Sequence, residues 1–238
     1  MSIQHLLIRF LLIVVGVLCF DGAAFAQDES AVESVSLWQM YNYGGIVGYL
    51  LTILSMISLG LAIEHFLSLR RDQMVPPDLV GHVEELFEEE AFEDVMNVCD
   101  EQPTMLTNVL AAGLPKIGTG YSNISEAMQE VSILEATKLN QKVSYIGLIA
   151  SIAPLMGLFG TVTGMIKTFN TIATSAGSPN PKQLAGGIQQ ALVTTCMGLM
   201  VAIPATVLFF FFRNRVTRII LEINGIIDEL MDRFREDA

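Results

Sequence analysis

GLFGTVTGMIKTF, the stretch from Gly157 to Phe169, places three glycines and three threonines inside an otherwise apolar run. Small residues let a second helix approach closely within a membrane, and hydroxyl groups give that contact a polar character. The stretch has no carboxylate, the kind of group that proton relays through membranes use. We therefore expect a membrane helix that lines the path of a polar element, with any proton-carrying carboxylate supplied by another chain.

The composition of the 238 residues is typical of a membrane protein. Hydrophobic residues make up 52% of the chain and lie in long runs between charged blocks, not at the regular spacing of a soluble core. The net charge of −12 argues against nucleic acid as a partner, because phosphates attract Lys and Arg. Much of the acidity lies in residues 84–101, which hold nine carboxylates and no basic residue and indicate a solvated helix face. The cysteines and histidines are dispersed, so neither a metal site nor a cofactor is predicted.

The N-terminal residues 1–26 are typical of a secretory signal peptide. Arg9 precedes an apolar core from Phe10 to Phe20, and Ala24 and Ala26 form an A-x-A cleavage site. We expect the mature chain to begin near Gln27, with an uncleaved membrane anchor as the alternative. Residues 27–43 would then form a periplasmic segment, ending in aromatic residues suited to the headgroup region.

Three long apolar segments predict an all-α membrane protein with three transmembrane helices. The predicted transmembrane segments are residues 44–63, 143–168 and 184–212. The segments between and after them are a cytoplasmic helical domain (64–142), a periplasmic turn (169–183) and a cytoplasmic C-terminal helix (213–238). In the cytoplasmic domain we expect a helical hairpin, with one amphipathic block from Val83 to Cys99 and a second stretch, MLTNVLAAGL, from Met105. A long helix then begins near Ser125 and leads into the membrane.

Basic residues near the ends of these segments predict the orientation. Nearly all of them flank the same side, which the positive-inside rule assigns to the cytoplasm. They are Arg70, Arg71, Lys138, Lys142, Arg213, Arg215 and Arg218. We therefore expect a multi-pass protein of the bacterial inner membrane with a periplasmic N-terminus and a cytoplasmic C-terminus.

Small residues recur at steps of three and four along one face of the second and third transmembrane segments. We expect close helix packing at Pro154, Gly157, Gly160, Gly164, Gly187, Ala191, Gly198 and Ala202. One interpretation is packing alone, with each threonine bonded to a carbonyl one turn earlier. The other is a polar bundle interior, favoured by hydroxyls on both segments and by an amide that is costly to expose to lipid. The candidate pathway residues are Thr161, Thr194, Thr195 and Gln190.

The three predicted transmembrane segments contain no Asp, Glu or His. Hydroxyl and amide groups can orient water or a partner, but they do not hold a proton at ordinary pH. A carboxylate from another chain's membrane helix would complete a proton pathway.

Three stretches resemble the MotA/TolQ/ExbB proton-channel family, and its ExbB/TolQ branch in particular. They are APLMGLFGTVTGMIKTF from Ala153, GIQQALVTTCMGLMVAIPA from Gly187 and EEEAFEDVMNVCDEQPTMLTNVLAAGL from Glu88. The resemblance implies a homo-pentamer around the membrane helices of an ExbD- or TolR-like single-span dimer, whose aspartate carries the proton. The proton flow would power a TonB- or TolA-like protein in envelope work such as outer-membrane transport.

The resemblance assigns the pore threonines of the family to Thr161 and Thr195. Gln190 departs from the family pattern, because well-known ExbB and TolQ proteins have a glutamate there, and glutamine cannot titrate. Two other classes of function stay open beside the channel. One is a scaffold that assembles envelope proteins without conducting protons, and the other is a hydrolase with a threonine nucleophile, for which Lys167 is the nearest base. We expect no enzymatic activity.

Overall fold

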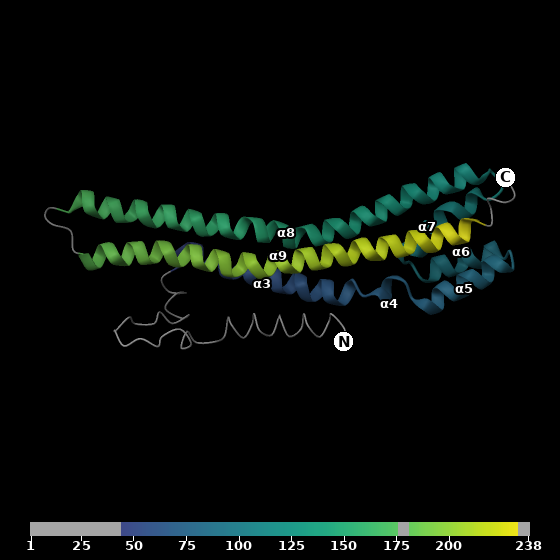
Figure 1. The fold of residues 1–238 in the computed structure, drawn as a ribbon, viewed down its shortest axis with the longest axis horizontal. Coiled ribbons are helices and arrows are strands. Elements are labelled where there is room, and N and C mark those ends of the chain that lie inside the picture. Colours follow the sequence, from purple (N-terminus) through teal and green to yellow (C-terminus); the bar gives the residue numbers. More distant parts are fainter. Residues whose placement is uncertain (1–43, 176–180, 233–238) are drawn as a thin grey trace. The chain divides into compact units, whose positions relative to one another are not determined.

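The computed structural model describes residues 44–175 and 181–232. The predicted signal peptide and the segment 27–43 lie outside these residues. The described residues form helices and turns without a strand, which confirms the all-α prediction. The helices are α3 (Gly45–Ser68), α4 (Arg71–Met74), α5 (Pro77–Glu88), α6 (Phe92–Glu101), α7 (Met105–Gly113), the 3-10 helix η1 (Leu114–Lys116), α8 (Tyr121–Thr174) and α9 (Pro181–Asp232) (Figure 1).

Three helices are long and apolar enough to cross a membrane, as predicted. They are α3, α8 and the part of α9 from Leu184 to Asp232. Each continues beyond the predicted transmembrane segment, because the charged residues that follow the apolar runs do not interrupt helical geometry. The transmembrane limits themselves therefore stay predictions.

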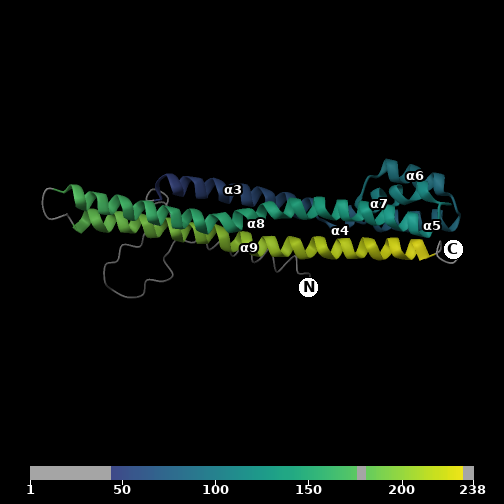
Figure 2. The ribbon, with the colours of Figure 1, turned by 90° about the horizontal axis from the view of Figure 1, so that it is seen from above.

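The described chain divides into two compact units. The first unit contains residues 44–59 and 148–207, and the second contains residues 60–147 and 208–232. In the first unit α8 and α9 lie side by side, as both views show (Figures 1 and 2). Three buried residues, Leu51 of α3, Ala153 of α8 and Ala202 of α9, form its small apolar core.

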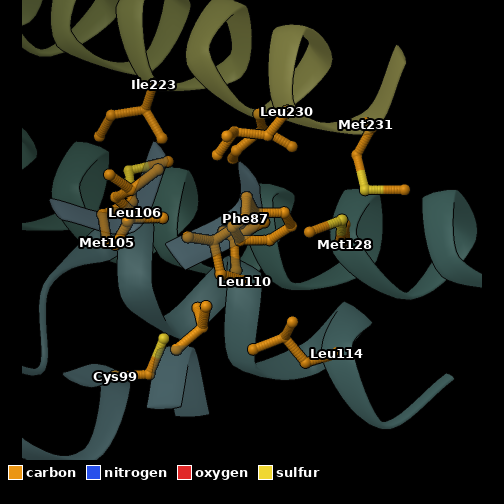
Figure 3. Packing of buried hydrophobic residues seen from close by; sticks show 14 of the residues in the cluster. Phe87, Cys99, Met105, Leu106, Leu110, Leu114, Met128, Ile223, Leu230 and Met231 are labelled. Carbon is orange, nitrogen blue, oxygen red and sulfur yellow. The ribbon is translucent and has the colours of Figure 1, made fainter. Parts of the chain in front are cut away.

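The second unit has a larger core. Helices α5, α6 and α7 gather beside the adjoining parts of α8 and α9 (Figure 2). In Figure 3, Ile223 and Leu230 of α9 point toward Leu106 and Leu110 of α7, and Phe87 of α5 lies beside them. All five side chains are buried in one apolar cluster, which holds the short helices together.

Local signals in the sequence explain where the short helices begin. Pro77 occupies the first turn of α5, where its missing N–H costs nothing. Thr104 caps α7 by accepting a hydrogen bond from the Thr107 N–H, and the Thr107 hydroxyl accepts one from the Thr104 N–H.

The second unit differs from the sequence-based expectation in two details. The amphipathic block from Val83 to Cys99 is divided into α5 and α6 by Glu90, whose φ of 56° reverses the chain. With α7, which the sequence predicts, the expected two-helix hairpin becomes three short helices. Helix α8 begins at Tyr121 and not near Ser125, directly after Gly120, whose φ of 102° favours glycine.

Candidate functional site

Glycines bring the backbones of α8 and α9 into direct contact in the first unit. A Cβ atom on Gly157 would lie 2.9 Å from the carbonyl oxygen of Thr194 and 3.0 Å from the Cα atom of Thr195. A Cβ atom on Gly198 would lie 2.7 Å from the carbonyl oxygen of Ala153, and one on Gly164 would lie 3.0 Å from the Ala191 Cβ atom. No side chain fits at Gly157 or Gly198 unless the two helices separate.

Two further glycines make room for threonine side chains. A Cβ atom on Gly160 of α8 would lie 2.6 Å from the Cβ atom of Thr194 on α9. In the reverse direction, a Cβ atom on Gly187 of α9 would collide with the Oγ1 atom of Thr168 on α8. Pro154 lies half-buried within α8. Six of the eight predicted small-residue positions therefore take part in this contact, and Ala202 lies in the small core that includes α3.

Thr161 and Thr195 are joined across the contact. Their hydroxyl groups hydrogen-bond to each other, and either oxygen can act as the donor. The Thr161 hydroxyl also lies 3.1 Å from the carbonyl oxygen of Ala191 on the opposite helix. Both side chains are half-buried, so the pair lies at the edge of the helix contact.

The carbonyl oxygen of Gly157 is the centre of this arrangement. Three hydroxyls lie within hydrogen-bonding distance of it, at 3.2 Å for Thr161, 3.4 Å for Thr194 and 3.3 Å for Thr195. Thr194 has a shorter bond of 2.7 Å to the Ala191 carbonyl. We call Thr161, Thr194 and Thr195 the threonine cluster. Each hydroxyl can donate one hydrogen bond and accept up to two. The three hydroxyls can therefore change hydrogen-bond partners within the cluster without leaving an oxygen unpaired.

Not every threonine in these helices makes such a contact. Thr168 donates to the Gly164 carbonyl at 2.9 Å, and Thr206 donates to the Ala202 carbonyl at 2.7 Å, each within its own helix. These are the local bonds expected of a hydroxyl in an apolar helix. The threonine cluster differs because its hydroxyls reach the other helix.

Gln190 lies apart from the pair of Thr161 and Thr195. Its Nε2 atom is 2.9 Å from the position of a Cβ atom on Gly45, at the start of α3. Gln190 and Thr194 line a cavity of about 310 Å³ together with Thr163 and Lys167 of α8. The four predicted pathway residues therefore fall into two groups. Thr161 and Thr195 form the hydroxyl pair, and Gln190 lines the cavity. Thr194 belongs to the threonine cluster and also lines the cavity. Sequence reasoning did not connect Gly45 or Thr163 with the site, although the Gly44–Gly45 pair signals a close approach.

One polar residue of the second unit is buried in a way that the sequence did not predict. His65 is 2% exposed, and its ring lies edge-on to Phe212 with a centroid distance of 5.4 Å. Within the described residues neither ring nitrogen has a hydrogen-bond partner. The apolar segment was expected to end at Ile63, and the continuation of α3 to Ser68 is what carries His65 into a helix contact.

Across residues 44–175 and 181–232, no group of three or more His, Cys, Asp or Glu residues is arranged to hold a metal ion. Lys167 is the one charged residue within the predicted transmembrane segments. The chemistry available at the helix contact is therefore hydrogen bonding by hydroxyl, amide and carbonyl groups.

Three apolar helices, two of them in glycine-mediated contact, define a multi-pass helical membrane protein. Residues 101–225, just over half of the chain, match the model of the MotA/TolQ/ExbB proton channel family. The chain belongs to this family, which is described as a family of proton channels. The family and the three apolar helices together indicate the inner membrane.

The chain is similar to several biopolymer transport proteins. It is 29% identical over 180 residues to a putative ExbB homolog of Methanothermobacter thermautotrophicus, covering 75% of this chain and 63% of that protein. It is 33% identical over 174 residues to the putative ExbB-like protein 1 of Synechocystis sp., covering 70% and 66%. It is 35% identical over 95 residues to the Tol-Pal system protein TolQ of Haemophilus influenzae, covering 40% and 41%. The chain thus spans just under two thirds of the length of the first two relatives.

Two solved structures share the fold. The structure of C. jejuni MotAB matches with a TM-score of 0.60 at 16% identity, covering 100% of this chain and 91% of that chain. The flagellar MotAB stator complex of Bacillus subtilis matches with a TM-score of 0.51 at 17% identity, covering 96% and 86%.

Proposed function

We propose that this protein is a proton-conducting subunit of an inner-membrane channel that couples the proton-motive force to work in the cell envelope. The observation that carries the proposal is the threonine cluster, in which hydroxyls of α8 and α9 share carbonyls across a glycine-lined contact. Hydroxyls in a low-dielectric setting can orient water and a partner's carboxyl group. They cannot hold the proton themselves, since their protonation does not change near neutral pH.

The missing titratable group would come from a partner. We propose an ExbD/TolR-like single-span dimer whose membrane aspartate lies against Thr161 and Thr195. Three findings support this proposal. The chain belongs to the proton channel family, it is similar to ExbB and TolQ proteins, and it shares its fold with a protein of the MotAB stator complex of Bacillus subtilis. Five copies of this chain would surround the dimer, and a TonB- or TolA-like protein would receive the work.

The proposed topology follows the distribution of basic residues. The N-terminus would lie in the periplasm, the segments 44–63, 143–168 and 184–212 would cross the membrane, and residues 64–142 and 213–238 would lie in the cytoplasm. Most of the second unit, including its short helices, would then lie in the cytoplasm.

Proton flux into liposomes tests the proposal. The protein is reconstituted alone and with an ExbD-like partner, and flux is measured under an imposed pH gradient. We expect flux only with the partner, and loss of flux when the partner's membrane aspartate is replaced by asparagine. Proton flux from this chain alone would show that the proton-carrying group does not have to come from the partner.

The hydroxyl pair is tested by Thr161→Val and Thr195→Val, which keep the shape of the side chain and remove the hydroxyl. Each should reduce partner-dependent flux about tenfold, less than the roughly 10²–10⁴-fold that a group transferring the proton itself contributes. Thr206→Val is the matched control, because the Thr206 hydroxyl bonds within its own helix. Undiminished flux in both variants would exclude the cluster from the pathway.

A scaffold that assembles envelope proteins without conducting is the second candidate. It is favoured by Gln190, which holds a neutral amide where well-known ExbB and TolQ proteins have glutamate. The test is a complex with the partner that has the expected mass. If this complex shows no proton flux, with or without the TonB- or TolA-like protein that would receive the work, the protein is a scaffold and not a channel.

A further inference from the structure

The cavity of the first unit that Gln190 and Thr194 line contains one charged side chain, that of Lys167. Its volume of about 310 Å³ is at the lower end of the range of about 300–1,000 Å³ that is usual for small-molecule sites. Gly160 and Gly164 also line the cavity and have no side chain that would fill it. An ionisable group inside a predicted transmembrane segment indicates a functional site, and its partner has to be identified.

The side chains around the cavity offer more hydrogen-bond donors than the chain itself uses. The hydroxyls of Thr163 and Thr194 donate to backbone carbonyls of their own helices, at 3.0 and 2.7 Å. Among the described residues, the Lys167 ammonium and the Gln190 amide have no hydrogen-bond or ion-pair partner. Lysine has three N–H donors and a positive charge, and the glutamine amide has two N–H donors beside its carbonyl oxygen. The unused donors and the uncompensated positive charge match an anion.

The cavity lies where two predicted transmembrane segments reach the same membrane surface. Gly44 begins the predicted segment 44–63, and Lys167 lies one residue before the end of the predicted segment 143–168. Because Gly44 and Lys167 line the same cavity, the limits of both segments lie at its level. A lysine at this level extends its ammonium toward the lipid headgroups. In the proposed topology this membrane surface is the periplasmic one.

An exposed apolar surface begins at the cavity and follows α3. Ile46 lines the cavity and is 80% exposed. Leu50 and Ile53, four and seven residues later, lie on the same face of α3 and are 46% and 53% exposed. An anion cavity that continues into an apolar surface matches a ligand with an anionic head and an acyl chain.

We propose that this cavity binds the phosphate of an anionic phospholipid, phosphatidylglycerol, with Lys167 and Gln190 as the hydrogen-bond donors. One acyl chain of the lipid lies along the exposed face of α3 that begins at Ile46. The single positive charge of the lining balances the single negative charge of phosphatidylglycerol, whereas the ammonium group of phosphatidylethanolamine would repel Lys167. The proposal rests on the membrane insertion of these helices and not on proton conduction, so a failed flux experiment leaves it standing.

The experiment counts the lipids that stay with the purified full-length protein. Protein is extracted from membranes that contain phosphatidylglycerol and phosphatidylethanolamine, and the retained lipids are quantified by mass spectrometry. We expect phosphatidylglycerol to be enriched over its share in the membrane. Lys167→Gln should reduce the enrichment about fivefold, the effect of about one basic contact to an anionic headgroup, and Lys167→Arg should preserve it. Unchanged enrichment in Lys167→Gln overturns the proposal.

Lys142→Gln is the matched control for charge. Lys142 is an exposed lysine of the same helix, and it flanks the other end of the same predicted transmembrane segment. The substitution removes the same charge outside the cavity and should leave the enrichment unchanged. An equal reduction by Lys142→Gln and Lys167→Gln would show a general attraction of lipid to positive charge, and the cavity would not be the site.

Thr163→Leu tests the cavity itself, because it fills space there and keeps the charge of Lys167. It should lower the enrichment at least as much as Lys167→Gln. Thr137→Leu is its control, since Thr137 is an exposed threonine of α8 outside the cavity whose hydroxyl also bonds within the helix. Circular dichroism checks the folding of each variant, and exposed Lys167 decides the test alone if Thr163→Leu does not fold. Full enrichment in folded Thr163→Leu would show that the lipid does not enter the cavity, and would overturn the proposal.

Two further arms separate the sources of phosphate. Dioleoylphosphatidylglycerol should raise the melting temperature of the detergent-solubilised protein, and dioleoylphosphatidylcholine and inorganic phosphate should not. The increase should be lost in Lys167→Gln. Equal stabilisation by inorganic phosphate would mean that a free phosphate compound is the ligand, and the lipid proposal would be wrong.

Discussion

Gly157 has two roles that depend on the same missing side chain. Because Gly157 has no Cβ atom, the backbone of α9 lies within 3.0 Å of the position that a Cβ atom would occupy. This close approach brings three threonine hydroxyls to the Gly157 carbonyl oxygen. A larger residue would remove both features at once. The packing and the hydroxyl arrangement of this site are therefore inseparable at this position.

Gly157→Ala should lower stability by about 1–3 kcal/mol, the usual cost of inserting a methyl group into a filled contact. It should also reduce partner-dependent flux, because the separated helices no longer hold Thr161 and Thr195 together. Thermal unfolding and liposome flux measure the two effects. Gly186→Ala is the control: nothing lies within 4 Å of its Cβ position, so the change should be neutral or stabilising by about 0.5–1 kcal/mol. Equal melting temperatures for both variants would contradict the contact.

Cys99 provides a prediction in the second unit. Burial raises the pKa of its thiol to about 11, the charge of Asp100 adds to this, and a hydrogen bond from the Ala111 backbone acts against it. The folded state therefore holds the thiol proton more tightly than the unfolded state. The resulting stabilisation is present below about pH 9 and is lost as the pH rises toward 11.

Alkylation by iodoacetamide as a function of pH checks this prediction, with Cys19 and Cys196 replaced by alanine. We expect Cys99 to react slowly at pH 8 and much faster near pH 11, since the thiolate is the nucleophile. Denatured protein, in which the same thiol is exposed, serves as the reference. Reaction of the folded protein at pH 8 as fast as the denatured reference would show that Cys99 is not protected.

At the residue scale the sequence predicts which positions share a face but not which neighbour each one meets. The steps of three and four correctly group Gly157, Thr161 and Gly164, because helix geometry alone sets that grouping. The position of Gln190 depends on where α3 packs, and no local pattern specifies that. The burial of His65 was not predicted for a similar reason, since it results from contact with Phe212, 147 positions later in the chain.

Among the elements, α7 illustrates how a short helix is held at its start. Thr104 and Thr107 exchange hydrogen bonds, and the Thr107 hydroxyl also donates to the Gln102 carbonyl at 2.7 Å. Helix α7 supplies Leu106, fully buried in the core of the second unit. The cap therefore fixes an element on which the packing of this unit depends.

Thr104→Ala should destabilise the second unit by about 1 kcal/mol, the usual value of a lost N-terminal cap. Thermal unfolding followed by circular dichroism should show a lower midpoint. Thr137→Ala is the control, because the exposed Thr137 hydroxyl bonds back to Ile133 within α8 and its loss should change stability by less than about 0.5 kcal/mol. Identical midpoints for Thr104→Ala and the wild type would contradict the role of the cap.

Element types could be predicted from the sequence more reliably than their limits. The three apolar runs gave the three long helices, since hydrophobicity over twenty residues is a strong signal. The division between α5 and α6 was not foreseen, because Glu90 has no glycine-like signature and adopts a positive φ only in the folded unit. The long course of α8 was foreseen, whereas its start was not, because the helix begins at Tyr121 and not near Ser125.

On the scale of the whole molecule, the proposed topology places the two ends of α8 on opposite sides of the membrane. Lys138 and Ser175 are both exposed, and each can carry a cysteine in a background without other cysteines. In intact spheroplasts a membrane-impermeant maleimide should label Ser175→Cys and spare Lys138→Cys until the membrane is disrupted. The opposite labelling pattern would invert the proposed orientation, and labelling of both in intact spheroplasts would show that α8 does not cross the membrane.

The glycine contact between α8 and α9 has a mechanical consequence. Two helices whose backbones touch, and whose hydroxyls are joined at Thr161 and Thr195, cannot slide past each other without losing both the close packing and the shared hydrogen bonds. Within the first unit, α8 and α9 should therefore move together as one rigid body. If the protein rotates or tilts under load, the movement would then occur at its contacts with other chains and with lipid, and not between these two helices.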